Sequence, residues 1–137
     1  MDGTRPLADA DETFAAALAA RLPECRIGRP QPGHLEEPRG RWQGRGGVLA
    51  RPATTEEVAA IVGACAEARV PIVPYGGGTG LVGGQIAEEG PLPVILSLDR
   101  MHAIRDVDPH ENVLIAEAGA VLADIQRAAR DVKRLFP

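Results

Sequence analysis

The chain has 137 residues, of which 45% are hydrophobic and 25% charged, a composition typical of one globular domain rather than of a disordered chain. Its formal net charge of -4 argues against nucleic acid and against an anionic membrane surface as partners, since both favour basic proteins. No apolar run approaches the ~20 residues of a membrane span, and the acidic start of the chain lacks a secretory signal, so we expect no transmembrane segment and a cytoplasmic location. Cys25 and Cys65 have no metal-site spacing, and we expect both thiols to be reduced and buried.

The chain begins with a predicted helix between residues 9 and 21. Phe14, Leu18 and Leu22 recur there at helical spacing, and either Asp9 or Asp11 can cap the helix. Pro23 ends it.

An irregular arm is predicted from Gly28 to Gly47, because its many Gly and Pro residues leave no periodic pattern. Arg39, Arg41 and Arg45 lie here near Trp42, an arrangement that imitates an RNA-binding Arg-Gly tract. The acidic composition disfavours RNA, and we expect the arm to lie over the domain.

A β-α-β unit follows. Val48–Ala50 predicts a strand, the pair Thr54 and Glu57 predicts a capping box at a helix start, and residues 70–73 predict a second strand. Such a unit favours a parallel pair of strands with a right-handed crossover. The helix would turn one face to the core, formed by Val58, Ile61, Val62 and Cys65.

The remaining elements are a buried strand at 93–98, a hairpin of strands 104–108 and 113–118, and a helix after Gly119. Asp106 and Asp108 imitate a catalytic carboxylate pair, but their position beside Pro109 favours roles at the turn and at the strand edge. No catalytic residue and no metal site is assigned, since the three histidines are scattered.

The segment from Gly76 to Gly84 carries the functional signal. Six of its nine residues are glycine, directly after a predicted strand, and consecutive N–H groups in such a loop can bind a phosphate. The loop has no lysine, which excludes a Walker A site. Gly78 to Gly83 also matches the Rossmann fingerprint, with Asp99 at the expected distance, but residues 85–92 are too short for the required helix.

In these residues the sequence resembles FAD-linked oxidases of the vanillyl-alcohol-oxidase (PCMH-type) family. The similarity is greatest to the D-2-hydroxyacid dehydrogenases, which include D-lactate dehydrogenase, the FAD subunit of glycolate oxidase and D-2-hydroxyglutarate dehydrogenase. It runs from about Arg39 to Pro137 and rests on four segments: Arg51–Val58, Val73–Gly84, Leu96–Met101 and Glu117–Gly119.

The resemblance implies an α+β fold, the N-terminal part of a PCMH-type FAD-binding domain with a small β-α-β sheet subdomain and the start of a second subdomain. Residues 1–46 would form the N-terminal helix and arm, and residues 47–137 the first half of the FAD-binding domain. FAD would be bound without a covalent link, because no histidine lies in or beside the loop. The residues that the resemblance assigns to the pyrophosphate are Pro74, Tyr75, Gly76, Gly77, Gly78, Thr79, Gly80, Leu81, Gly83 and Gly84.

The activity that the resemblance implies is oxidation of a D-2-hydroxy acid to a 2-oxo acid, with hydride transfer to the flavin. Tyr75 stands where relatives often carry Gln or Arg, and Pro38 stands near a position where many carry Trp. In relatives the chain continues into a second half of the flavin site and a substrate-binding cap domain, so we expect no turnover from these residues alone. The alternative is a non-catalytic nucleotide-phosphate-binding module or a truncated remnant with unpaired sheet edges.

Overall fold

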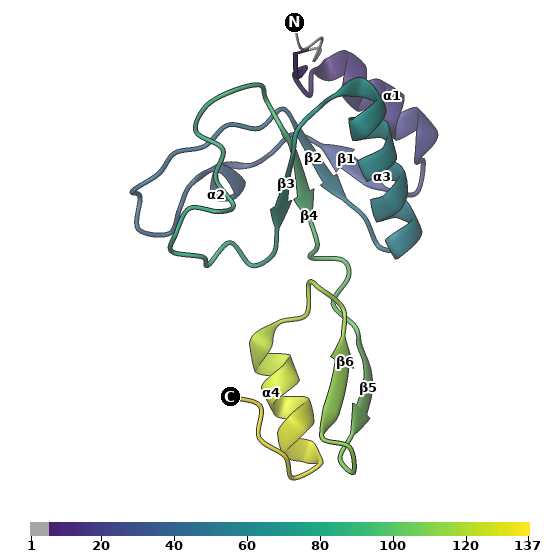
Figure 1. The fold of residues 1–137 in the computed structure, drawn as a ribbon, viewed down its shortest axis with the longest axis vertical. Coiled ribbons are helices and arrows are strands. Elements are labelled where there is room, and N and C mark those ends of the chain that lie inside the picture. Colours follow the sequence, from purple (N-terminus) through teal and green to yellow (C-terminus); the bar gives the residue numbers. More distant parts are fainter. Residues whose placement is uncertain (1–5) are drawn as a thin grey trace, which may run out of the picture.

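A four-stranded sheet is the framework of the N-terminal part of the computed structural model, which describes residues 6–137 (Figure 1). The strand order is β1-β2-β4-β3; β2 and β3 both run parallel to β4, and β1 runs antiparallel to β2. The strands are β1 (Arg26–Gly28), β2 (Val48–Arg51), β3 (Ile72–Tyr75) and β4 (Val94–Ser97).

The predicted strands at 48–50 and 70–73 are parallel but are not direct neighbours, as a simple β-α-β unit would make them. β4 lies between them, with Val94 paired to Val48 on one side and to Ile72 on the other. All four residues of β4 are buried, and a strand that is apolar on both faces takes the centre of a parallel sheet.

Two helices cover one face of the sheet (Figure 1). In α1 (Glu12–Arg21) the Asp11 carboxylate accepts the N–H of Phe14, which confirms Asp11 as the N-cap. In α3 (Thr55–Ala68) the Thr54 hydroxyl accepts the N–H of Glu57 as predicted, while the Glu57 carboxylate accepts the N–H of Ala53. The Glu57 carboxylate thus binds the N–H of the residue before the N-cap, whereas in a regular capping box it binds the N–H of the N-cap itself.

The hydrophobic core lies between these helices and the sheet. Ala10 and Leu18 lie in it beside residues of the β-α-β unit, so the N-terminal helix and the domain share one core. Cys25 and Cys65 are free, buried thiols there, and burial raises the pKa of Cys65 to about 11. The other core residues are Val48, Ala50, Ile61, Ala64, Val70, Val94 and Leu96.

The arm is less irregular than its sequence predicts. A short helix, α2 (Pro32–Leu35), interrupts it, because Gln31 and His34 form a reciprocal capping box and Pro32 opens the helix. The prediction of a continuous irregular segment from Gly28 to Gly47 is therefore wrong at these residues.

The C-terminal unit is an antiparallel hairpin of β5 (Ile104–Asp108) and β6 (Val113–Ala116), followed by α4 (Leu122–Asp131). These elements confirm the predicted hairpin and helix. The Asp108 carboxylate accepts the N–H groups of His110 and Glu111, which confirms its role in the turn. Within residues 6–137 we find no helix long and apolar enough to cross a membrane.

Candidate functional site: the glycine loop and its cavity

The glycine loop leaves β3 at Tyr75 and reaches β4 without forming a helix, so the Rossmann alternative is excluded by the structure as well as by loop length. Its carbonyl groups are tied to the protein. Gln85 Nε2 donates to the carbonyl oxygens of Gly78 (3.3 Å) and Gly80 (2.9 Å), and Arg39 Nη2 donates to that of Leu81 (2.7 Å). The hydrogen bonds that fix the loop therefore use its carbonyl oxygens.

The backbone donors of the same loop are free. None of the N–H groups from Gly76 to Gln85 donates a hydrogen bond to another residue between 6 and 137. A run of unpartnered N–H groups beside fixed carbonyls can bind an anion, since each peptide presents its positive end.

A cavity of about 580 Å³ adjoins the loop. One wall consists of Gly76, Gly77 and Thr79 from the loop. The opposite wall includes the start of α4, whose N-cap, Val121, offers no side-chain acceptor to the first helical N–H groups. Both walls therefore favour negative charge. The remaining lining residues are Asp99, His102, Ala118, Gly119, Ala120 and Leu122.

Four glycines of the loop form two contrasting pairs. Gly78 and Gly83 have φ of 70° and 74°, a backbone conformation that favours glycine. The Tyr75 phenol occupies the space of a Cβ on Gly78, and the Trp42 ring lies only 3.3 Å from a Cβ on Gly83, so the fold itself favours glycine at both positions. A Cβ on Gly76 would meet nothing within 4 Å, and one on Gly77 would meet only Thr79 at 4.0 Å. The fold does not need glycine at these two positions, whereas a phosphate lying against the backbone does. The residues present thus fit the diphosphate of a dinucleotide such as FAD.

Asp99 lies at the cavity and is held as a carboxylate. The Arg51 guanidinium donates to both of its oxygens, and Ser97 Oγ donates to Oδ1 at 2.8 Å. The hydrogen bonds and the charge of Arg51, together with the hydrogen bond from Ser97, outweigh the effect of burial and lower the pKa of Asp99 to about 2. Arg51 neutralises this charge and lessens its repulsion of a phosphate.

The backbone after Asp99 orients His102, whose Nδ1 donates to the Asp99 carbonyl oxygen at 2.9 Å. Nδ1 therefore carries a proton, since a carbonyl can only accept. Glu117, beyond the hairpin, accepts the N–H of Ala103 and a guanidinium N–H of Arg105, and these bonds lower its pKa.

The structure brings only part of the expected set to this cavity. Gly77 and Thr79 also line a second hollow of about 400 Å³, which they share with Tyr75, Gly78 and arm residues around Glu37. Pro74, Gly80, Leu81, Gly83 and Gly84 line neither space. The sequence analysis did not assign His102 or residues 120–122 to the site. Two of the family-like segments end directly before them, at Met101 and at Gly119, and could have indicated these residues.

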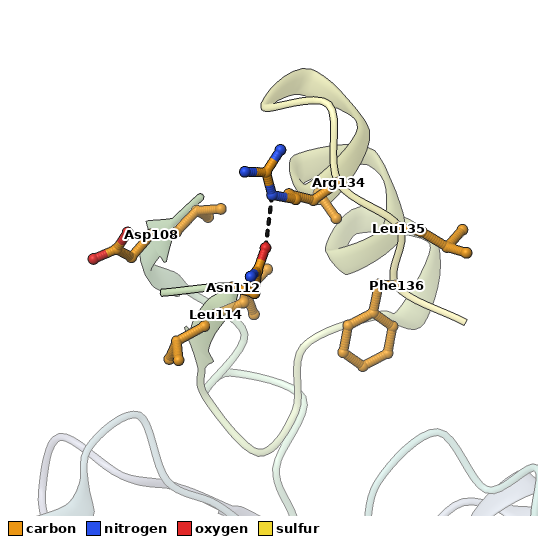
Figure 2. Close-up of a pocket in the computed structure, with 9 residues that line it drawn as sticks. Asp108, Asn112, Leu114, Arg134, Leu135 and Phe136 are labelled. Atoms are coloured by element: carbon orange, nitrogen blue, oxygen red, sulfur yellow. Dashed lines mark hydrogen bonds between the residues drawn. The ribbon is translucent and has the colours of Figure 1, made fainter. Parts of the chain in front are cut away.

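A third space, of about 150 Å³, lies inside the C-terminal unit and contains none of the expected site residues. Figure 2 shows Arg134 reaching from the end of α4 toward Asn112 in the hairpin turn. Its Nε donates to Asn112 Oδ1 (2.7 Å) and to the Pro109 carbonyl (3.0 Å), which fastens the turn to the helix. Phe136 and Leu135 flank the space. In residues 6–137 no three His, Cys, Asp or Glu side chains gather as metal ligands would.

Comparison with known proteins agrees with this geometry. A family model described as "FAD binding domain" matches residues 47–137. D-lactate dehydrogenase from Anaerostipes hadrus is 38% identical over 90 residues, covering 66% of this chain and 18% of the relative. The mitochondrial D-2-hydroxyglutarate dehydrogenase of Bos taurus is 33% identical over 138 residues, covering 96% of this chain and 24% of the relative.

Among solved structures, an alkyldihydroxyacetonephosphate synthase superposes with a TM-score of 0.73 at 20% identity, over 95% of this chain and 26% of the synthase. At that identity the likeness shows the fold, which is the N-terminal part of a PCMH-type FAD-binding domain, as the sequence predicts. The chain spans a quarter or less of the length of the two curated relatives. It belongs to the FAD binding domain family of FAD-linked oxidoreductases, and its cofactor is FAD.

Proposed function

We propose that the glycine loop binds the diphosphate of FAD, with the backbone N–H groups from Gly76 onward as donors. The observation that carries this proposal is the run of loop N–H groups that have no partner within residues 6–137, in a loop whose residues Gly76, Gly77 and Thr79 line a cavity. Thr79, which lines the same wall, adds a hydroxyl donor. The proposed residues are those of the sequence analysis: Pro74, Tyr75, Gly76, Gly77, Gly78, Thr79, Gly80, Leu81, Gly83 and Gly84.

The proposed attachment is non-covalent, since the glycine loop contains no histidine and neither Cys25 nor Cys65 is accessible. His102 lines the cavity from outside the loop. We expect His102 to contribute hydrogen bonding through Nε2, because Nδ1 is engaged with the Asp99 carbonyl. When bound, the flavin would supply a hydride acceptor.

We propose that the parent reaction is oxidation of a D-2-hydroxy acid, on the strength of the relatives that act on D-lactate and D-2-hydroxyglutarate. The residues that line the cavity include no arginine and no lysine to hold a substrate carboxylate. We therefore assign the cofactor to this chain and expect no dye reduction by the 137 residues with either acid. Reduction specific for the D enantiomers would contradict this division of roles.

The experiment that tests the cofactor site is a titration of FAD into the 137-residue chain, followed by flavin fluorescence. We expect saturable binding that ADP competes away, because ADP carries the same diphosphate. Riboflavin, which lacks phosphate, is the matched ligand control and should not bind at the same concentrations. FAD binding that ADP leaves unchanged would place the contact elsewhere than the phosphate loop.

A further inference from the structure

The arm contains a buried carboxylate that organises a tight turn beside the glycine loop. Glu37 is 1% exposed, and its side-chain oxygens accept the N–H groups of Arg39 and Arg41, both at 3.1 Å, and Nε of Arg39 at 3.0 Å. Burial alone would raise the pKa of Glu37, but these hydrogen bonds together lower it, so the carboxylate stays charged. The turn closes through the bond from the Gly40 N–H to the Glu37 carbonyl at 2.7 Å.

Arg39 links this turn to the loop. Its Nε lies on the Glu37 carboxylate and its Nη2 donates to the Leu81 carbonyl at 2.7 Å. The planar guanidinium can hold both acceptors at once, whereas the single ammonium of lysine cannot span them.

Two further contacts join the arm to the same loop. The Tyr75 hydroxyl, at the start of the loop, donates to the Gly33 carbonyl at 2.8 Å. The Trp42 ring lies 3.3 Å from the point where a Cβ on Gly83 would be, so the indole packs against the loop backbone. The arm thus holds the loop at its beginning, at Leu81 and at Gly83.

We propose that Arg39, fixed by Glu37, is a positioning residue for the FAD phosphate loop. By holding the Leu81 carbonyl toward the arm, it orders the loop in the conformation whose N–H groups are free to bind the diphosphate. The inference rests on the proposed function of the loop. It adds a role for the arm, since the family match begins only at residue 47.

The test compares Arg39→Met with Arg41→Met in the 137-residue chain. The two variants lose the same charge two positions apart, but the Arg41 guanidinium makes no hydrogen bond or ion pair to any residue between 6 and 137. The first measurement is ¹⁵N relaxation of the loop amides without ligand. We expect Arg39→Met to lose order from Leu81 to Gly84, and Arg41→Met to match the unmodified chain.

The second measurement is FAD affinity well below the unfolding temperature. We expect a loss of about tenfold for Arg39→Met, the factor for one hydrogen bond from a charged donor, and no loss for Arg41→Met. Arg39→Lys, which keeps the positive charge beside Glu37, should resemble Arg39→Met in both measurements.

Equal loop order in the two methionine variants would overturn the positioning role, and so would full recovery of order by Arg39→Lys. If the unmodified chain binds neither FAD nor ADP, the proposed function fails, and the relaxation result still decides whether Arg39 orders the loop. A loss of stability without a change of loop order would show that Arg39 is structural only.

Discussion

The phenol of Tyr75 occupies the space that a side chain on Gly78 would need: its Cζ atom lies 2.6 Å from the position of a Cβ on Gly78. The same hydroxyl donates to the Gly33 carbonyl, and Gly78 has φ of 70°. The loop therefore turns back over its own first residue, and glycine is required at 78 for two separate reasons, collision and backbone conformation.

This relationship predicts the result of Gly78→Ala in two backgrounds. With Tyr75 present we expect the free energy of unfolding to fall by about 2–4 kcal/mol, the sum of left-handed strain and overpacking. With Tyr75→Leu the collision is relieved, and the cost should fall to about 1 kcal/mol. Urea unfolding of the four chains measures the coupling.

Gly90→Ala is the control for strain alone, since Gly90 has φ of 82° and no atom within 4 Å of the added Cβ. It should cost about 1 kcal/mol in either background. Strictly additive effects of the Gly78 and Tyr75 changes would show that the phenol does not press on the loop.

Gly76→Ala separates binding from folding. A Cβ there meets nothing within 4 Å and φ is not in the left-handed region, so we expect the free energy of unfolding to stay within about 0.5 kcal/mol. The methyl group would stand at the cavity wall beside the free N–H groups, and FAD affinity should fall about tenfold.

Gly28→Ala is its matched control, because Gly28 is equally open but lies in β1, outside the cavity lining. Fluorescence titration and urea unfolding of both variants give the two quantities. Unchanged FAD affinity in Gly76→Ala would remove this residue from the site.

The sequence predicts best those features that depend on neighbouring residues. The Thr54 cap and the hairpin turn at Asp108 are local patterns, and both are present. The predicted face of α3 is confirmed at Ile61 and Cys65 but is wrong at Val62, which is 45% exposed, while Ala64 is buried. The position of β4 between β2 and β3 is not local, because it depends on which strand can be buried on both faces. α2 escaped prediction because Gly and Pro occupy half of it, and its stability comes from Gln31 and His34.

The same distinction applies to the candidate site. Glycine density marks the loop wall, including Gly76 and Gly77, from sequence alone. The opposite wall, His102 and residues 120–122, reaches the cavity only through the turn after β4 and the hairpin. The bond from Arg39 to Leu81 joins residues 42 positions apart, which no periodicity indicates.

The lowered pKa of Asp99 predicts that the folded chain loses stability in acid. Its pKa is lowered from 3.8 to about 2 in the folded chain, so its contribution is complete above the unfolded value and disappears as the pH falls through about 2. The full difference would amount to about 2.5 kcal/mol, but the side chain is 41% exposed and screened, and we expect about 1 kcal/mol.

Asp99→Asn should therefore be less stable than the unmodified chain by about 1 kcal/mol at neutral pH, and the difference should shrink between about pH 4 and pH 2. Asp106→Asn is the control, since the Asp106 carboxylate has no hydrogen-bond or ion-pair partner within residues 6–137. Urea unfolding as a function of pH measures both. A difference for Asp99→Asn that does not vary with pH would show that the ion pair with Arg51 contributes nothing.

Gly119 lies where the C-terminal unit meets the end of β4, and it leaves no room for a side chain. A Cβ there would collide with the Leu98 carbonyl and would lie 2.9 Å from the Met101 carbonyl oxygen, and both are backbone atoms that cannot turn aside. We expect Gly119→Ala to lower the free energy of unfolding by about 3 kcal/mol.

Gly63→Ala is the same chemical change in the interior of α3 with open space around it, and should raise stability by about 1 kcal/mol. The midpoints of thermal and urea unfolding should thus be lower for Gly119→Ala and higher for Gly63→Ala than for the unmodified chain. If both variants were stabilised, the close approach of Gly119 to Leu98 would be wrong, and with it the wall that the 118–122 segment gives to the candidate cavity.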